Sequence, residues 1–80
     1  MNRAEKEVKT ILLMLFHEKL KGCREEIGLT QAEVAERIAV SRSTYTRYER
    51  GDTEPDLATT LKLARLFGVT TDWLIDPEEK

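Results

Sequence analysis

Residues 30–51 constrain the fold more than any other stretch, because they carry the local signals that begin and end two short helices. Thr30 and Glu33 have the spacing of a capping box, in which each side chain accepts a hydrogen bond from the backbone N–H of the other residue. Ser41 is suited to cap a second helix, and Gly51 is suited to end it in the left-handed conformation. These signals predict helices over residues 30–38 and 42–50.

The connection between the two predicted helices is only residues 39–41. So short a turn makes the helices cross steeply, which is the geometry of a helix-turn-helix. At the angular spacing of a helix, the second helix has two unlike faces. One face carries Tyr45 and Tyr48. The other carries guanidinium and hydroxyl groups, from Arg42, Ser43, Thr46, Arg47 and Arg50.

The polar face of the second helix has the chemistry of a DNA reader. An arginine can donate two hydrogen bonds to the edge of a guanine in the major groove, and serine or threonine can bond bases or phosphates. The alternative is a solvated basic face on an ordinary surface helix. The capping box, the short turn and the glycine at the end of the helix favour the DNA-reading interpretation.

Length and charge limit the other possibilities. From a length of 80 residues we expect one domain, with no room for a second, ligand-sensing or catalytic one. At a net charge of −2, DNA binding needs local segregation of charge, and acidic residues do gather outside the reading helix, at 52–56 and 76–79. The single cysteine permits no internal disulfide and suits the cytoplasm. The apolar run 11–16 is too short to span a bilayer, so we expect no membrane contact.

Residues 5–27 are predicted to form one long helix with two apolar stripes. The stripe expected to face the core is Phe16, Leu20, Cys23 and Ile27. The other, roughly 90° away on the helix, is Val8, Ile11, Leu12 and Leu15. One straight helix cannot direct both stripes at one small core, so the second suggests a contact with another copy of the chain. The alternatives are a β-strand over residues 10–16 and a segment that folds back on its own domain.

The C-terminal half predicts two further helices. Pro55 and Asp56 can start a helix over residues 57–67. Its expected apolar face is Leu57, Leu61, Ala64 and Phe67. Thr70 can cap a short last helix over residues 71–75, which carries Trp73, and Pro77 ends it. The predicted fold is therefore all-α, with five helices.

Several segments within residues 16–75 match one known pattern: Gly28-Leu-Thr-Gln-Ala-Glu-Val-Ala35, Val40-Ser-Arg-Ser-Thr-Tyr45, Tyr48-Glu-Arg-Gly51, Pro55, Leu61-Lys-Leu-Ala64 and Gly68-Val-Thr-Thr-Asp-Trp-Leu74. In these segments the chain resembles the Cro/C1-type (XRE) helix-turn-helix family, the lambda-repressor-like DNA-binding domains. The resemblance implies a five-helix domain of a bacterial or phage transcription regulator, commonly a repressor. Such proteins bind palindromic operators as dimers, with the second motif helix in the major groove of double-stranded DNA.

The resemblance also implies roles for individual residues. The positions that face base edges are Arg42, Ser43, Thr46 and Arg47. The positions near the phosphate backbone are Gln31, Thr44 and Arg50. Arg24 and Glu49 match a salt bridge that ties the first helix to the reading helix. We therefore expect an N-terminal extension over residues 1–15, a DNA-binding domain over 16–75 and an acidic tail over 76–80.

Three features depart from the usual pattern of the family. Ala39 stands where a turn glycine is frequent, which predicts a slightly strained or differently shaped turn. Tyr45 fills a core position that is more often Ile or Val. Asp52 and Glu54 replace basic residues, which predicts fewer phosphate contacts and a shallower salt dependence of DNA binding.

The leading hypothesis is a sequence-specific DNA-binding repressor that acts as a homodimer on a palindromic operator. The candidates for its dimer interface are Val8, Ile11, Leu12, Leu15 and Trp73. One alternative is an antitoxin or other protein-interaction module whose partner binds the N-terminal apolar segment. Another is a structural DNA binder without sequence preference, which the acidic net charge disfavours.

No catalytic site, cofactor or metal is expected, so the chain is not predicted to be an enzyme. One histidine, His17, and one cysteine, Cys23, cannot form the usual zinc ligand set. There is no nucleotide-binding glycine loop and no set of nucleophile, histidine and carboxylate. We expect a surface or half-buried position for His17 and a small apolar core role for Cys23.

Overall fold

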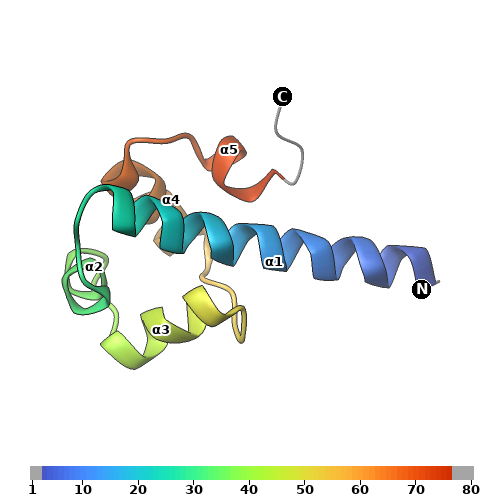
Figure 1. The fold of residues 1–80 in the computed structure, drawn as a ribbon, viewed down its shortest axis with the longest axis horizontal. Coiled ribbons are helices and arrows are strands. Elements are labelled where there is room, and N and C mark those ends of the chain that lie inside the picture. The colour runs from blue at the N-terminus through green and yellow to red at the C-terminus, as the bar shows by residue number, and fades with distance from the viewer. Residues whose placement is uncertain (1–2, 77–80) are drawn as a thin grey trace.

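The computed structural model describes the backbone of residues 3–76 and the side chains of residues 15–76. Within residues 3–76 the chain forms five helices and no strand, which confirms the predicted all-α fold (Figure 1). The helices are α1 (Arg3–Glu26), α2 (Gln31–Arg37), α3 (Arg42–Arg50), α4 (Leu57–Phe67) and α5 (Thr71–Ile75).

The longest helix, α1, contacts both α3 and α5, which lie below and above it in Figure 1. Its N-terminal half extends away from the other four helices. The alternative of a β-strand over residues 10–16 is wrong, because these residues lie inside α1. Leucine and methionine dominate this run and are strong helix formers, whereas strands favour β-branched and aromatic residues. None of the helices of residues 3–76 has the length and apolarity needed to cross a bilayer.

The helix boundaries follow local signals in the sequence. The Thr30 hydroxyl accepts a hydrogen bond from the Glu33 backbone N–H at 3.1 Å, and the Glu33 carboxylate accepts one from the Thr30 N–H at 2.9 Å. The predicted capping box is therefore confirmed. At the start of α3, the Ser41 hydroxyl accepts a backbone hydrogen bond at 3.1 Å. The last two helices are capped in the same way, by Asp56 and Thr70.

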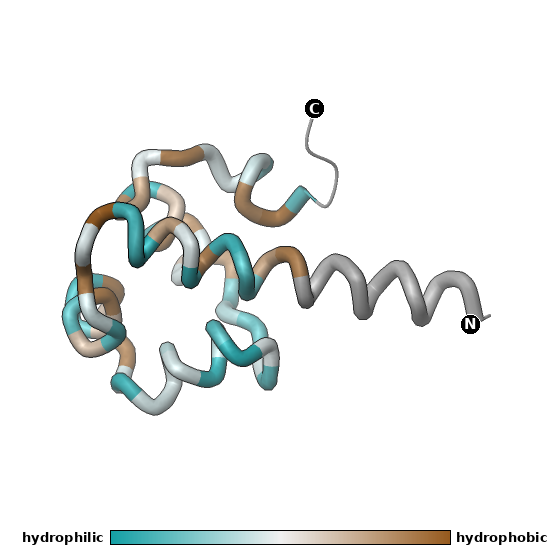
Figure 2. The backbone as a smooth tube through the Cα atoms, viewed as in Figure 1, coloured by the Kyte–Doolittle hydropathy of each residue, from teal (hydrophilic) through white to brown (hydrophobic). Residues whose placement is uncertain are grey.

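All five helices contribute to one hydrophobic core. The buried apolar residues are Leu20, Val34, Ala35, Ile38, Tyr45, Tyr48, Leu63, Ala64, Phe67 and Leu74. Phe16 and Cys23 of α1 pack against this set, as predicted. Figure 2 shows that α3 is hydrophilic along most of its length. Its two tyrosines meet edge to face, with ring centroids 6.3 Å apart, and anchor it to the core.

Two apolar faces differ from the predicted ones. Ile27 is 43% exposed rather than buried, and it lies one residue beyond the end of α1. On α4, Leu57 is 89% exposed and Leu61 is 41% exposed, whereas Leu63 is fully buried. The helix presents Leu63 and Phe67 to the core, and Leu66 packs partly buried against it. Leu57 and Leu61 are left facing solvent.

Candidate nucleic-acid interface

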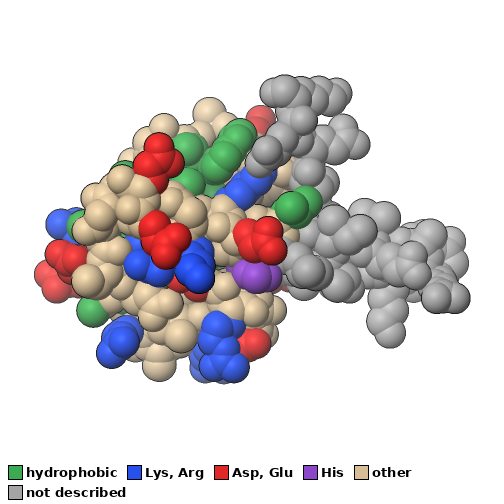
Figure 3. All heavy atoms as spheres, viewed as in Figure 1, with side chains coloured by type: hydrophobic (Ala, Val, Ile, Leu, Met, Phe, Trp, Pro, Cys, Tyr) green, Lys and Arg blue, Asp and Glu red, His purple; other side chains and the backbone are tan. Residues whose placement is uncertain are grey.

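The solvent-facing side of α3 collects the polar side chains that the sequence predicted on one face. They line a single shallow hollow of about 360 Å³: Arg42, Ser43, Thr46, Arg47 and Arg50. Thr46 is half-buried and the other four are exposed. Figure 3 shows Lys and Arg side chains along the lower edge of the molecule, over α3. The arrangement presents several hydrogen-bond donors on one solvent-facing side of α3.

The two ends of α3 carry further polar groups. At the N-terminal end, the Ser41 hydroxyl donates to the Thr44 hydroxyl at 2.8 Å and lies 3.2 Å from the Ser43 hydroxyl. At the C-terminal end, Arg50 forms a salt bridge with Asp52 at 3.3 Å. Because both side chains of this pair are largely exposed, the pair contributes little to stability. It does offset part of the positive charge at that end.

A bidentate ion pair holds the inner side of α3 to α1. Arg24 Nε donates to Glu49 Oε2 at 2.6 Å, and Arg24 Nη2 donates to Glu49 Oε1 at 3.1 Å. Their side chains are only 14% and 4% exposed. The same arginine donates to the Leu29 carbonyl oxygen at 3.0 Å. Since two parallel bonds fix direction as well as distance, the pair orients α3, while its net contribution to stability is limited by the cost of burying two charges.

The surroundings of this pair set the charge states behind α3. Burial disfavours the charged form of Glu49, but hydrogen bonds from Arg24 and Gln31 outweigh it, and the pKa of Glu49 is lowered. The hydrogen bond to Glu49 in turn raises the pKa of Arg24. The Tyr45 hydroxyl is buried, and no acceptor or donor lies at hydrogen-bonding geometry from it. Burial, together with the nearby Glu49 charge, raises the pKa of Tyr45. Glu49 is therefore ionised and Tyr45 neutral at pH 7.

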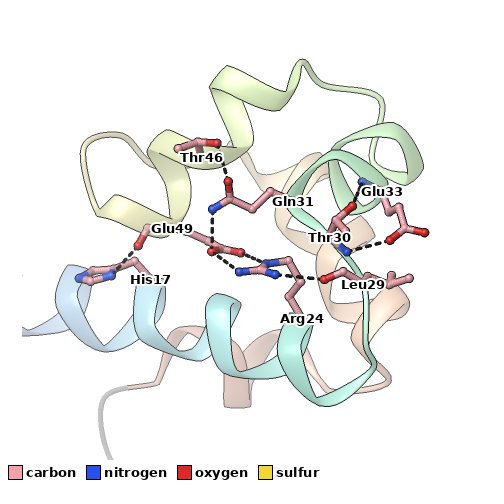
Figure 4. Close-up of polar contacts among 8 residues, drawn as sticks. All are labelled: His17, Arg24, Leu29, Thr30, Gln31, Glu33, Thr46 and Glu49. Atoms are coloured by element: carbon pink, nitrogen blue, oxygen red, sulfur yellow. Dashed lines mark hydrogen bonds and ion pairs between the residues drawn. The ribbon is translucent and has the colours of Figure 1, made fainter.

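Gln31, the first residue of α2, bridges the ion pair and the exposed face (Figure 4). Its Nε2 atom donates to Glu49 Oε1 at 3.1 Å. Its Oε1 atom accepts a hydrogen bond from the Thr46 hydroxyl at 3.0 Å. The side chain that the sequence assigned to a phosphate is thus also part of the network that holds α3, a role that sequence reasoning missed.

His17 forms a second link between α1 and α3 that sequence reasoning did not anticipate. Its Nδ1 atom is 2.8 Å from the Glu49 carbonyl oxygen, and the side chain is half-buried, as expected. The imidazole also lies against Gly51, where an added Cβ atom would be 2.8 Å from His17 Cδ2. Gly51 has a φ of 76°. The position after α3 therefore needs glycine both for its backbone conformation and for the space that His17 occupies.

Only part of the predicted dimer-interface set lies within the described side chains. The residues outside it are Val8, Ile11 and Leu12. Leu15 is half-buried, and Trp73 is 40% exposed. The Lys19 ammonium group lies 4.6 Å from the Trp73 ring centroid and donates to the Trp73 carbonyl oxygen at 2.7 Å. Trp73 therefore packs against α1 with part of its ring open to solvent.

An open apolar groove of about 610 Å³ lies between α1, α4 and α5. Its apolar lining is Phe16, Pro55, Leu57, Leu61 and Ile75. The sequence pattern had placed three of these residues, Phe16, Leu57 and Leu61, on apolar faces expected to face the core. No local signal separates a leucine that covers a core from one that borders a groove.

The described residues show no group of three or more His, Cys, Asp or Glu side chains placed to hold a metal ion. Cys23 is half-buried, and burial raises the pKa of its thiol, with the nearby Glu26 charge adding to the effect. The thiol is therefore protonated at pH 7 and fills the edge of the core as a small apolar group.

The geometry of α2 and α3, two crossed helices with a polar outer face, agrees with the family that the sequence matches. A sequence profile of the helix-turn-helix family matches residues 20–74. The chain belongs to this family. The match is of the Cro/C1 type and spans every residue to which the sequence assigned a DNA contact or the supporting salt bridge.

Relatives of this helix-turn-helix chain carry names of transcription regulators. The SPbeta prophage-derived HTH-type transcriptional regulator YonR of Bacillus subtilis (strain 168) is 43% identical over 61 residues, which cover 76% of this chain and 56% of YonR. The transcriptional repressor RstR of the cryptic phage CTXphi, from Vibrio cholerae, is 40% identical over 65 residues, which cover 81% of this chain and 59% of RstR. The chain thus spans a little over half the length of these relatives.

Solved structures share the helix-turn-helix fold. The P22 c2 repressor in complex with a synthetic operator superposes with a TM-score of 0.76 at 25% identity, over 80% of this chain and 97% of that one. A transcriptional regulator from Listeria innocua gives a TM-score of 0.73 at 31% identity, over 81% of this chain and 61% of that one. The predicted lambda-repressor-like fold is confirmed.

Proposed function

We propose that this helix-turn-helix chain binds a specific DNA sequence and represses transcription, as a homodimer on a palindromic operator. The observation that carries the proposal is the outer face of α3, where three arginines and two hydroxyl side chains share one hollow. The opposite face of the same helix is fixed by buried tyrosines and a bidentate ion pair. The names of the relatives, and the operator bound to the P22 c2 repressor, support the same function.

In the proposed mechanism, α3 of each copy enters the major groove of one half-site. Arg42 and Arg47 donate two hydrogen bonds each to guanine edges, with Ser43 and Thr46 beside them. The backbone is held by Gln31, Thr44 and Arg50, and these contacts set register rather than sequence. An occupied operator then blocks access of RNA polymerase to the promoter.

The proposal of a homodimer follows from the symmetry of a palindromic operator, because a two-fold site is read by two equivalent helices. The exposed leucines of α4 support it, since Leu57 and Leu61 border an apolar groove that a second copy could cover. Light scattering at micromolar concentration measures the mass directly. A monomeric mass both free and on DNA would contradict the homodimer.

The test of the function is selection of binding sites from a randomised duplex pool, followed by titration of the winning sequence by fluorescence anisotropy. We expect a two-fold symmetric consensus with half-sites about one helical turn apart. Weak binding without any enriched sequence would contradict a sequence-specific regulator.

A matched pair of variants separates base reading from general charge. Arg47→Ala is expected to weaken binding to the selected site by about 1–3 kcal/mol and to relax discrimination at one base pair. Arg65→Ala makes the same charge change at an exposed position on α4 and should have little effect. Equal losses for Arg47→Ala on selected and scrambled DNA would show that Arg47 does not read a base.

A further inference from the structure

Four side chains are linked by a series of hydrogen bonds that runs from the buried interior to the outer face of α3 (Figure 4). From inside outward its members are Arg24, Glu49, Gln31 and Thr46. Thr46 also lines the hollow that holds the three arginines. Thr46, the outer end of this hydrogen-bond series, therefore faces the space that a base edge would occupy.

The direction of each hydrogen bond is set from the buried end. Glu49 is paired with Arg24, and an ionised carboxylate can only accept hydrogen bonds. Gln31 must therefore turn its NH₂ group toward Glu49, which leaves its oxygen toward Thr46. An amide oxygen also only accepts, so Thr46 must donate its single hydroxyl proton to Gln31.

We propose that Thr46 reads the operator purely as a hydrogen-bond acceptor, with Gln31 as the positioning residue that imposes this polarity. Once its proton is committed, the Thr46 hydroxyl offers only lone pairs to the groove. The amino groups of adenine (N6) and cytosine (N4) are donors there, whereas guanine O6 and thymine O4 are acceptors. The base that faces Thr46 is therefore adenine or cytosine. This inference rests on the proposed function, because it sets the polarity of one contact within it.

Ser43, the other hydroxyl residue that lines the hollow, is not constrained in this way. Its Oγ atom lies 3.2 Å from Ser41 Oγ, a long contact between two exposed hydroxyls. No amide or carboxylate fixes the direction of this contact, so the Ser43 hydroxyl can rotate its proton away from Ser41. Ser43 can therefore present a donor or an acceptor to DNA. The base pair that it faces serves as an internal comparison for the base pair that Thr46 faces.

The first experiment uses the full chain, its selected operator and Thr46→Val, which keeps the branched shape of the side chain and removes the hydroxyl. Repeating the selection with this variant identifies the base pair that Thr46 reads, as the one whose preference changes. At that pair, the facing base is replaced by an analogue that lacks only the amino group, purine for adenine or 2-pyrimidinone for cytosine. We expect wild-type affinity to fall about two- to tenfold and the affinity of Thr46→Val to stay unchanged.

The second experiment tests the positioning role of Gln31. Gln31→Met has a side chain of similar length that cannot fix the Thr46 hydroxyl, so Thr46 regains the ability to donate. We expect the preference for amino over keto bases to fall toward equality at the Thr46 base pair only, with the pair read by Arg47 unchanged. Loss of a phosphate contact alone would weaken all sequences alike. Circular dichroism establishes that the variant is folded.

Three results would overturn the inference while leaving the proposed function intact. The first is a guanine or thymine facing Thr46, with an affinity that depends on the Thr46 hydroxyl. The second is a selection in which Thr46→Val prefers the same bases as the wild type. The third is a preference for amino over keto bases that stays unchanged in folded Gln31→Met. If Gln31→Met does not fold, the amino-deletion experiment on Thr46→Val still decides. Failure of the wild-type chain to enrich any sequence would instead refute the proposed function and this inference together.

Discussion

Ala39, in the turn between α2 and α3, is the one non-glycine residue of the described chain with a positive φ, 60°. It ends α2 in a Schellman arrangement, in which its N–H donates to the Glu36 carbonyl and the Val40 N–H donates to the Ala35 carbonyl. An L-residue in this left-handed conformation brings its Cβ atom close to a carbonyl oxygen, at a cost of about 1–2 kcal/mol. The departure from glycine noted in the sequence therefore coincides with local strain.

Ala39→Gly should increase the free energy of unfolding. The substitution removes the strain of about 1–2 kcal/mol, while the extra freedom of glycine in the unfolded chain costs about 0.4–1 kcal/mol. The middles of these two ranges leave a net gain of about 0.8 kcal/mol. Because Ala39 is exposed, loss of its methyl group opens no cavity that would offset this gain. For a domain of this size, that gain raises the Tm by about 2–8 °C.

Urea titration followed by circular dichroism at the helical band measures the change. Ala32→Gly is the matched control, because Ala32 is exposed in the first turn of α2, where helical glycine costs up to about 1 kcal/mol. The two substitutions should move stability in opposite directions. If Ala39→Gly destabilises as Ala32→Gly does, the left-handed turn is not strained and the reasoning fails.

Three further predictions concern the contacts between α1 and α3. Arg24→Met leaves Glu49 buried without its cationic partner, with only the hydrogen bond from Gln31, and should lower the free energy of unfolding in urea by about 3–5 kcal/mol. Adding Glu49→Leu should recover much of this loss, and no recovery would mean that the buried charge was not its cause. The pKa of Glu49 is lower in the folded state than the value of about 4.3 for a glutamate in the unfolded chain. The Arg24–Glu49 pair therefore stabilises the fold fully above that unfolded pKa, and this contribution is lost as pH falls through the folded-state pKa. Acid unfolding should therefore begin at a higher pH in the wild type than in the double variant, and coincident acid transitions would contradict this. Gly51→Ala should lower the Tm more in the wild type than in His17→Ala. Both backgrounds carry the cost of the left-handed backbone, but only the wild type adds a clash of the new Cβ atom with the His17 ring. Equal Tm shifts would show that the His17 side chain moves aside without cost.

The parts of the fold that could be predicted from the sequence are those set by neighbouring residues. The Thr30–Glu33 box, the Ser41 cap and the glycine after α3 each act within about one helical turn, so their effect is visible in a short window. The sides of α3 were predictable for the same reason, because helical spacing alone separates its arginines from its tyrosines.

The parts that could not be predicted depend on contacts between distant segments. The two sides of α4 both carry leucines, and only the placement of the helix against the core decides that Leu63 is buried and Leu57 exposed. His17 and Glu49 are 32 positions apart, and nothing near either residue announces their contact. Gln31 was assigned a single partner, the phosphate, because a sequence does not show that Thr46 lies beside it.

The alternation of roles along α3 has an evolutionary consequence. Anchoring residues Tyr45, Tyr48 and Glu49 are interleaved with exposed residues such as Arg42 and Arg47, whose side chains take no part in the core. Substitutions at the exposed positions therefore meet little selection for folding, and under the proposed function a duplicated copy can acquire a new DNA target by a few of them. Thr46 is the exception, because its hydroxyl is tied to Gln31, so changes there should be inherited together with changes at residue 31.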